Sequence, residues 1–369
     1  MKRKFLIIVF ILLCINKINS QQIVQDENTS IPIPFVEIYA DNGDLIGLTD
    51  GSGFISNELN KKVFLSKSKS LTFFHFSYDK KIIFIENFQS SIVFSLNPSL
   101  KILNEVVISN NFTNKYLKLK GYFRSSQINE DNIQYFMDGI VEYYIEKGSD
   151  KIKMKIISYR TFENKNIKQL SKRFYFLVAG IPIFNDFCIL DNVYRAYKLN
   201  TINSQSTVIK NKNNDQDVGL ISTSGNLTTM QLQIISKENP KIMKFLGMES
   251  RLLNYNISSA FNITSKEGFN FKNIIYFKEI REYEIRRKKK DDFVKVDAIH
   301  EFFLLEKSYS NELENRNFDD FYSFKTNSSY NSDYWLNIKN TIYQPVPISI
   351  EKYISENLVE NKNIFQKKQ

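Results

Sequence analysis

Residues 31–54 read IPIPFVEIYADNGDLIGLTDGSGF and decide the fold of the first part of the chain. After Pro34 comes FVEIYA, an apolar and β-branched run that is typical of a strand. The Asn42-Gly43 pair is a strong hairpin signal, because both residues tolerate a positive φ. LIGLT then reads as the returning strand, and DGSG, which ends at Gly53, marks a second turn. The stretch predicts tightly turned antiparallel strands, and it contains neither a nucleophile–base pair nor a cluster of metal ligands.

Short apolar runs continue beyond this stretch. They are VFLS at 63–66, LTFFHF at 71–76, KIIFIE at 81–86, SIVFSL at 91–96 and ILNEVVIS at 102–109. Turn residues separate most of these runs, and no long helical period intervenes. About seven short strands within some 85 residues are typical of a compact antiparallel β-sandwich, so we predict one such domain over residues 23–108.

The ordered elements of this domain also carry a family resemblance. They lie at residues 32–38, 47–54, 71–78, 96–98 and 103–108, and together they resemble the carboxypeptidase-regulatory-like (CarboxypepD_reg-like) domain. The resemblance implies a transthyretin-like β-sandwich, an accessory domain without zinc ligands that is common in exported proteins of Bacteroidetes. The sequence departs from the family in two places. The opening QQIVQDENTS is a weak strand, and Ser77 stands where a glycine is usual.

The first twenty residues have the order of a secretory signal peptide. Lys2, Arg3 and Lys4 precede the apolar run FLIIVFILLCI, and the polar INKINSQQ follows. Residues 5–15 are too few to span a bilayer, which takes roughly 20. We therefore predict cleavage after Ser20, with an N-terminal anchor as the alternative. The mature chain then has no transmembrane span and lies in the periplasm, at the outer membrane or outside the cell.

Charge and cysteine content limit the partners of the mature chain. Removing residues 1–20 takes away four basic and no acidic residues, so the net charge falls from +10 to +6. The basic run at 286–290 is followed at once by two aspartates, which favours a solvated hairpin tip over a patch for nucleic acid or anionic lipid. Cys188 is then the only cysteine, which excludes an intramolecular disulfide, and its apolar neighbours predict a buried side chain.

Residues 109–117 are polar and predict a linker, and residues 118–369 predict a β-rich domain. Its main features are two long hairpins. IVEYYIE pairs with KIKMKIISYR, and residues 269–285 pair with 293–309, which predicts a broad, curved antiparallel sheet. Helices are expected at 163–173, 240–248 and 349–360, and a mobile loop at 200–217. The chain is therefore mainly β: a seven-stranded transthyretin-like sandwich, then a larger antiparallel sheet domain with a few helices.

No catalytic, cofactor-binding or metal-binding residue is predicted. His300-Glu301 lacks the second histidine of a helical zinc motif, and His75 reads as a strand residue. The turn at Asp50 lacks the alternating acidic ligands of a calcium loop. The G-x-S-x-G elbow of a nucleophilic serine is missing around Ser158, Ser171 and Ser224. Four aromatic residues lie near Pro345 and Pro347; they are Tyr330, Tyr334, Trp335 and Tyr343. Their rings either form a binding site, by stacking on a sugar or lining an apolar groove, or cap the open end of the sheet.

These observations favour a non-enzymatic exported cell-envelope protein, with an accessory sandwich joined to a β-rich binding or interaction domain. Its partners are envelope proteins, glycan or lipid, and not nucleic acid. A curved sheet partly closed by helices is similar in shape to LolA-like carriers, so a carrier of lipid or another hydrophobic ligand is the first alternative. A glycan-acting enzyme with unrecognised carboxylates is the second alternative.

Overall fold

The computed structural model describes most of the chain after residue 20. The described residues are 21–41, 45–75, 78–98, 114–130, 132–149, 151–164, 166, 180–235, 240–245, 248–263, 268–287, 289–311, 318–319, 327–338, 351 and 354–362. The predicted signal peptide and the predicted strand at 102–109 lie outside them. The chain is mainly β, with small N-terminal sheets and one large antiparallel sheet, and it divides into two compact units, Met1–Ser99 and Leu100–Gln369.

The N-terminal unit contains two small sheets around one core. The larger sheet has the order β3-β2-β4-β5 and is antiparallel; its strands are β2 (Glu37–Ala40), β3 (Leu45–Leu48), β4 (Ser70–Phe74) and β5 (Lys81–Phe84). The smaller sheet pairs β1 (Ile23–Asp26) with β6 (Val93–Leu96) in parallel. The weak opening segment of the sequence therefore does form a strand. Val24, Ile38 and Phe73 are among the fully buried members of the shared core.

The glycine-rich turn of residues 50–53 joins the two sheets through its backbone. Asp50 closes the turn, since its Oδ1 accepts hydrogen bonds from the N–H groups of Ser52 and Phe54 at 2.9 Å each. Gly53 has a φ of +76°, and a Cβ there would lie 2.9 Å from the carbonyl oxygen of Val24. The backbone of β1 can approach this closely only because residue 53 has no side chain.

Two helices replace parts of the predicted strands in this unit. The VFLS strand prediction is wrong, because these residues end α2 (Asn57–Leu65). Ser56 caps α2 by accepting from the N–H of Leu59 at 3.1 Å, and Leu59 and Val63, four residues apart, bury one helix face. The predicted strand at 81–86 is shorter than expected, because Ile85 begins α3 (Ile85–Ser90).

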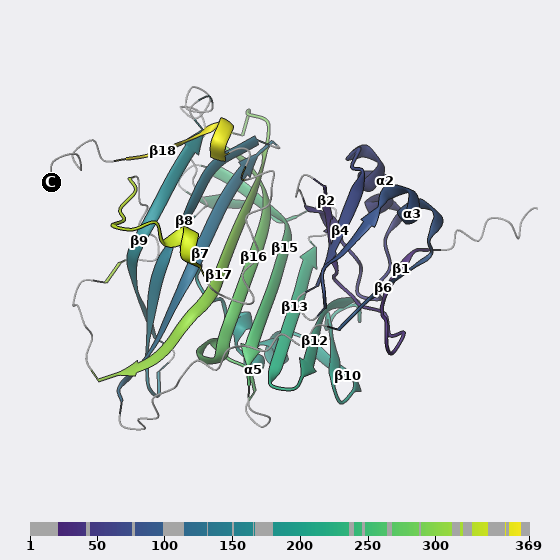
Figure 1. Ribbon diagram of the computed structural model, residues 1–369, viewed down its shortest axis with the longest axis horizontal. Coiled ribbons are helices and arrows are strands. Elements are labelled where there is room, and N and C mark those ends of the chain that lie inside the picture. Colours follow the sequence, from purple (N-terminus) through teal and green to yellow (C-terminus); the bar gives the residue numbers. More distant parts are fainter. Residues whose placement is uncertain are drawn as a thin grey trace, which may run out of the picture. The chain divides into compact units, whose positions relative to one another are not determined.

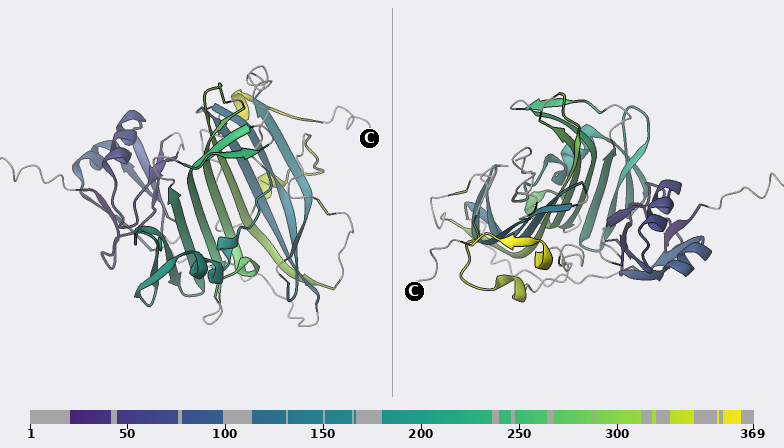
Figure 2. Two further views of the ribbon diagram at one scale, coloured as in Figure 1. Left: turned by 180° about the vertical axis from the view of Figure 1, so that it is seen from behind. Right: turned by 90° about the horizontal axis from the view of Figure 1, so that it is seen from above.

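The second unit is built on a single antiparallel sheet of 12 strands, which is visibly curved (Figures 1 and 2). Its order is β10-β11-β12-β13-β15-β16-β17-β7-β8-β9-β18, and β14 pairs with β15. The strands are β7 (Tyr116–Asn129), β8 (Asn132–Glu146), β9 (Ile152–Asn164), β10 (Lys198–Asn203), β11 (Ser206–Lys210), β12 (Asp217–Ser224), β13 (Leu227–Ile235), β14 (Met243–Phe245), β15 (Met248–Asn262), β16 (Ile274–Arg286), β17 (Val294–Ser310) and β18 (Leu358–Glu360).

Both long hairpins predicted from the sequence are confirmed. They are β8–β9 and β16–β17, and the basic run lies at the tip of the second, where Arg287 and Lys289 are exposed. The strand β7 begins at Tyr116, inside the predicted linker, and Tyr116 and Leu117 are buried. Because β17 pairs with β7, the centre of the open sheet joins strands that are far apart in the sequence.

Three other expectations for this unit are corrected. Residues 200–217 are not a loop but form most of β10, all of β11 and the start of β12, because Val208 and Ile209 bury a β-branched pair. In the predicted helix at 240–248, Met243–Phe245 form β14 and Met248 begins β15. Residues 354–356 are helical, but Leu358–Glu360 form β18 on the edge of β9. Of the predicted helix at 163–173, only 163–164 and 166 are described, and the first two end β9.

The remaining helices of the described residues are short. They are α5 (Leu190–Ala196) and the single turns Asp186–Cys188, Phe271–Asn273 and Tyr334–Asn337. Among the described residues, no helix has the length and apolar character needed to cross a membrane.

Candidate functional site

A row of three polar residues crosses the middle of the large sheet. Ser125 of β7 lies opposite His300 of β17, and His300 lies opposite Glu279 of β16. Residues directly opposite on antiparallel strands point to the same face, so the three side chains are neighbours. All three are buried, with exposed fractions of 1%, 7% and 3%. A serine, a histidine and a carboxylate in this arrangement are the residue types of a nucleophilic site.

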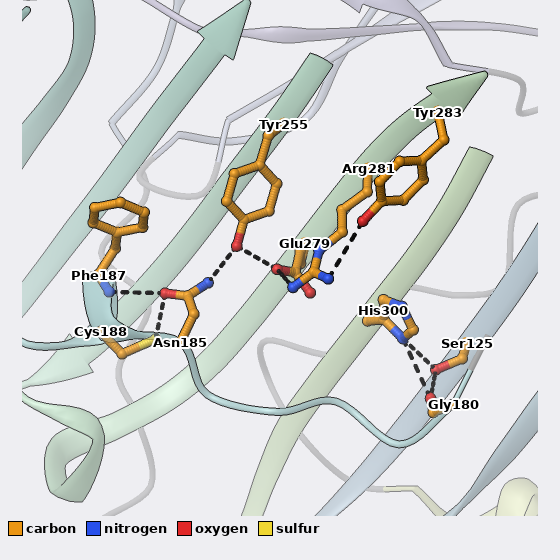
Figure 3. A network of polar contacts seen from close by, with 10 residues as sticks. All are labelled: Ser125, Gly180, Asn185, Phe187, Cys188, Tyr255, Glu279, Arg281, Tyr283 and His300. Carbon is orange, nitrogen blue, oxygen red and sulfur yellow. Dashed lines mark hydrogen bonds and ion pairs between the residues drawn. The ribbon is translucent and has the colours of Figure 1, made fainter. Parts of the chain in front are cut away.

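Residues 180–188, here called the strap, run across this face of the sheet (Figure 3). The Tyr143 hydroxyl donates to the carbonyl oxygen of Pro182 at 2.6 Å. Phe184 packs against three aromatic rings of the sheet, with centroid separations of 4.7 Å to Tyr143, 5.2 Å to Phe302 and 5.9 Å to Phe277. The strap is therefore held by an apolar anchor in its centre and by polar contacts around it.

The first polar contact joins Ser125, His300 and the carbonyl oxygen of Gly180. Nδ1 of His300 lies 3.1 Å from Oγ of Ser125 and 3.3 Å from the Gly180 oxygen, to which the Ser125 hydroxyl also donates. A carbonyl oxygen only accepts, so the proton of His300 must be on Nδ1 for that contact to be a hydrogen bond. A general base needs an unprotonated nitrogen facing the nucleophile. The geometry thus favours an anchor for the strap over a serine–histidine catalytic pair.

The second polar contact is a chain of side chains that starts on the strap. Nδ2 of Asn185 donates to the Tyr255 hydroxyl at 2.9 Å, and that hydroxyl donates to Glu279. Nη2 of Arg281 donates to Oε1 of Glu279 at 2.6 Å, and Nη1 lies 3.5 Å from the Tyr283 hydroxyl (Figure 3). Glu279 is 3% exposed whereas Arg281 is 37% exposed, so a buried carboxylate holds a guanidinium that reaches solvent.

Burial sets the protonation of this site. It lowers the pKa of His300, although Glu279 opposes that shift, so the imidazole is neutral at pH 7. Burial also lowers the pKa of Arg281, but the charge of Glu279 outweighs it and the pKa ends above its ordinary value. Burial, aided by Glu279, raises the pKa of Tyr255 far above pH 7. At neutral pH the His300 imidazole and the Tyr255 hydroxyl are therefore uncharged, whereas Arg281 is positively charged.

The opposite face of the same strands carries a row of alternating charges. The register places Arg160, Asp138, Arg124, Glu301 and Lys278 opposite one another across β9, β8, β7, β17 and β16. Arg160 binds Asp138 with Nη2 2.5 Å from Oδ2, and Arg124 pairs with Glu301. Burial alone would raise the pKa of Glu301, but the Arg124 charge outweighs it and lowers the pKa. This row aligns the central strands through ion pairs.

The predicted aromatic cluster is only partly described, and its described part packs on this second face. The Arg160 guanidinium stacks 3.7 Å from the ring centroid of Trp335, while Tyr330 and Tyr334 meet that ring edge-on at 5.1 and 5.0 Å. The Tyr334 hydroxyl donates to Oδ1 of Asp138 at 3.0 Å. Arg160, Tyr330 and Tyr334 all pack against the Trp335 ring. This packing favours the interpretation that the cluster caps the sheet. Tyr343, Pro345 and Pro347 lie outside the described residues.

The other residues that the sequence singles out lie at different places in the fold and form no common site among the described residues. Cys188 is fully buried, and burial raises the pKa of its thiol well above the ordinary value, which makes it unreactive. His75 lies one residue beyond β4, edge-on to Tyr78, and Ser158 lies in β9. Ser224 ends β12, and Ser171 lies outside the described residues. Within the described ranges, no group of three or more His, Cys, Asp or Glu side chains is arranged to hold a metal ion.

Sequence reasoning missed the row of Ser125, Glu279 and Arg281. The only local signal was alternation, since Glu279, Arg281 and Tyr283 share one parity in a strand whose other parity holds Lys278 and Ile280. The pairing of β7 with β17, which brings Ser125 to His300, leaves no local mark in the sequence. Comparison with known proteins adds no assignment: no family model matches the chain, and no curated protein is significantly similar to it.

Proposed function

We propose that the chain is a non-enzymatic, exported cell-envelope protein whose large sheet binds a polar ligand of the glycan class. In this proposal the N-terminal unit is an accessory domain of the carboxypeptidase-regulatory-like type, a seven-stranded transthyretin-like sandwich. The two small sheets on one core and the structural turn at Asp50 support an accessory role. The signal-peptide pattern of residues 1–20 supports export.

The observation that carries the binding role is the exposure difference within the Glu279–Arg281 pair. Glu279 is buried and holds the partly exposed Arg281, whose guanidinium lies 5.3 Å from the ring centroid of the half-buried Tyr255. Arginine has five N–H donors in a fixed plane, and among the described residues those of Arg281 face Glu279, Tyr283 and Tyr255. Pre-positioned donors beside tyrosine rings suit the hydroxyls and C–H faces of a sugar.

Two further observations favour this proposal over the alternatives. The Ser125 and His300 protons are directed to Gly180, which supports binding over acyl-transfer chemistry. The apolar part of the strap face is occupied by Phe184 and its aromatic neighbours, which supports a polar ligand over an acyl chain.

Calorimetric titration with soluble fragments of cell-envelope polysaccharide tests the proposal. We expect Arg281→Lys to weaken binding by about tenfold or more, because lysine retains the charge facing Glu279 but loses the planar donors. The matched control is Arg251→Lys, since Arg251 is also half-buried and paired with a glutamate, Glu284, on neighbouring strands. That control should bind as the unchanged protein does.

A parallel titration with a fluorescent fatty acid distinguishes the proposed glycan binding from the alternative of a lipid carrier. Saturable binding of the fatty acid without binding of any polysaccharide fragment would contradict the proposal and favour a lipid carrier. Retention of the intact first twenty residues on a cytoplasmic protein, found by cell fractionation, would contradict export.

A further inference from the structure

Three amide side chains meet near the turn between β7 and β8, and they are here called the amide cluster: Gln127, Asn129 and Gln134. Nε2 of Gln127 donates to Oδ1 of Asn129 and to Oε1 of Gln134, at 3.1 Å each. Nδ2 of Asn129 also donates to Oε1 of Gln134. Gln127 is fully buried, whereas Asn129 and Gln134 are half-buried. The amide cluster therefore extends from the core of the sheet towards its surface.

A β-bulge brings Gln134 into the amide cluster. Gln127 lies opposite Tyr135, and the next residue of β7 lies opposite Ile133, so Gln134 is the extra residue of β8 between these pairs. A bulge changes the direction of a side chain, and bulges are common beside functional sites. Oε1 of Gln134 accepts both hydrogen bonds from its neighbours, but no described residue accepts a hydrogen bond from its Nε2. Gln134 therefore keeps two N–H donors for a ligand.

The amide cluster lies on the same face of the sheet as Arg281. Arg281 of β16 lies opposite Ala298 of β17, and Ala298 lies opposite Gln127 of β7. In the next row, Tyr283 and Asn129 flank β17 in the same way. Opposite residues share a face, and two strand spacings amount to about 10 Å. Ala298 contributes only a methyl group between the two sides, so one ligand can contact the polar groups of both.

The charges of these groups favour an uncharged ligand. Arg281 already faces a carboxylate, since its Nη2 lies 2.6 Å from Oε1 of Glu279 in an ion pair. The amide cluster is uncharged and combines N–H donors with carbonyl acceptors. A sugar hydroxyl both donates and accepts, so it matches an amide in both respects. An anionic group only accepts, and it would have to share Arg281 with Glu279.

We propose that the amide cluster and Arg281 form two sides of one site, which binds an uncharged, hydroxyl-rich sugar across Ala298. This inference rests on the proposed function, and it adds the second side of the site and the class of the sugar. Gln134 donates to the sugar hydroxyls, and Asn129 contributes its remaining N–H. Gln127 positions both amides from the core.

Calorimetric titration with cell-envelope polysaccharide fragments, separated by anion exchange into uncharged and acidic fractions, tests this inference. Gln134→Glu keeps the oxygen that accepts both hydrogen bonds of the amide cluster and removes the Nε2 donors. We expect it to weaken binding of the uncharged fragments by about tenfold. The matched control is Gln233→Glu, because Gln233 is also half-buried but lies on the opposite face, next to the Ile234 that pairs with Tyr255. That control should bind as the unchanged protein does.

The outcomes separate this inference from the proposed function. Weaker binding in Arg281→Lys but not in Gln134→Glu would overturn the role of the amide cluster and leave the proposed function intact. Tighter binding of the acidic fraction than of the uncharged one would overturn the class of sugar. No binding of either fraction would overturn both proposals. If the thermal unfolding of Gln134→Glu shows that it does not fold, Asn129→Asp gives the same measurement, since it keeps the oxygen facing Gln127 and removes the N–H donors.

Discussion

His300 illustrates how the role of one residue follows from its contacts. In the sequence it stands before Glu301, and the pair invites a search for metal ligands. In the structure the two side chains point to opposite faces of β17: His300 meets Ser125 and the strap, and Glu301 meets Arg124. Adjacent strand residues cannot share a site on one face, because successive side chains alternate.

Protonation of His300 should make the protein less stable in mild acid. Its folded pKa is lowered below 6.5, so the unfolded chain binds the proton more readily as the pH falls through this value. The free energy of unfolding therefore falls below pH 6.5, by at most about 1.4 kcal/mol per pH unit, until the folded pKa is reached. His300→Asn retains an N–H donor for Gly180 but does not titrate.

Urea denaturation at pH 7 and pH 5 measures this effect. The unchanged protein should lose about 1–2 kcal/mol more than His300→Asn between the two pH values. His75→Asn serves as the control, because His75 belongs to the N-terminal unit, where its ring lies edge-on to Tyr78. An equal pH dependence of the original protein and His300→Asn would contradict a buried neutral imidazole at this position.

At the scale of elements, the positions of the long strands were predicted better than the pairing between strands that are far apart in the sequence. Hairpins such as β16–β17 could be read from alternation and a polar turn, because both signals are local. The helix α2 was missed, since VFLS has β-branched and aromatic residues, yet the cap at Ser56 and the four-residue spacing of Leu59 and Val63 select a helix. Burial of one face outweighed the local preference of four residues.

The row of alternating charges should help to fix the register in which β7 pairs with β17. Arg124 and Glu301 are both less than 10% exposed, so removing one leaves the other charged and buried. Arg124→Met alone should lower the free energy of unfolding by about 3–5 kcal/mol. The double variant Arg124→Met/Glu301→Gln should lose clearly less than the sum of the two single variants, because the two side chains interact directly.

Equilibrium denaturation of the four proteins of this double-mutant cycle gives the coupling energy. A surface ion pair on the same strands, Lys120 with Glu306, provides the comparison, since these side chains are 38% and 51% exposed. Its coupling should stay below about 1 kcal/mol. Equal coupling for the two pairs would contradict a special role of the buried row.

At the scale of the whole molecule, the two units have separate cores. The N-terminal core lies within residues 24–96, whereas the large sheet buries its own aromatic residues, Phe302 and Phe277 among them. The packing of each of these cores therefore comes from residues of its own unit.

Phe73→Ala should destabilise the N-terminal unit alone. Phe73 is fully buried and packs on Phe94 at a centroid distance of 5.2 Å, so the cavity should cost about 3–5 kcal/mol. Hydrogen exchange followed by mass spectrometry should show faster exchange within residues 23–96 and none of this change in β16 and β17. Phe302→Ala should give the reverse pattern. Faster exchange in both units from either variant would contradict independent cores.

The sequence alone determined the mainly β class, the two long hairpins, the structural turn at Asp50 and the burial of Cys188, because alternation, turn chemistry and apolar context act over a few residues. Only the tertiary structure decided which strands become neighbours. Ser125 and His300 meet across 175 positions of sequence, and the strap then reaches both. Register between distant strands depends on the packing of whole faces and not on any local pattern, which is why the row from Ser125 to Glu279 emerged only from the folded sheet.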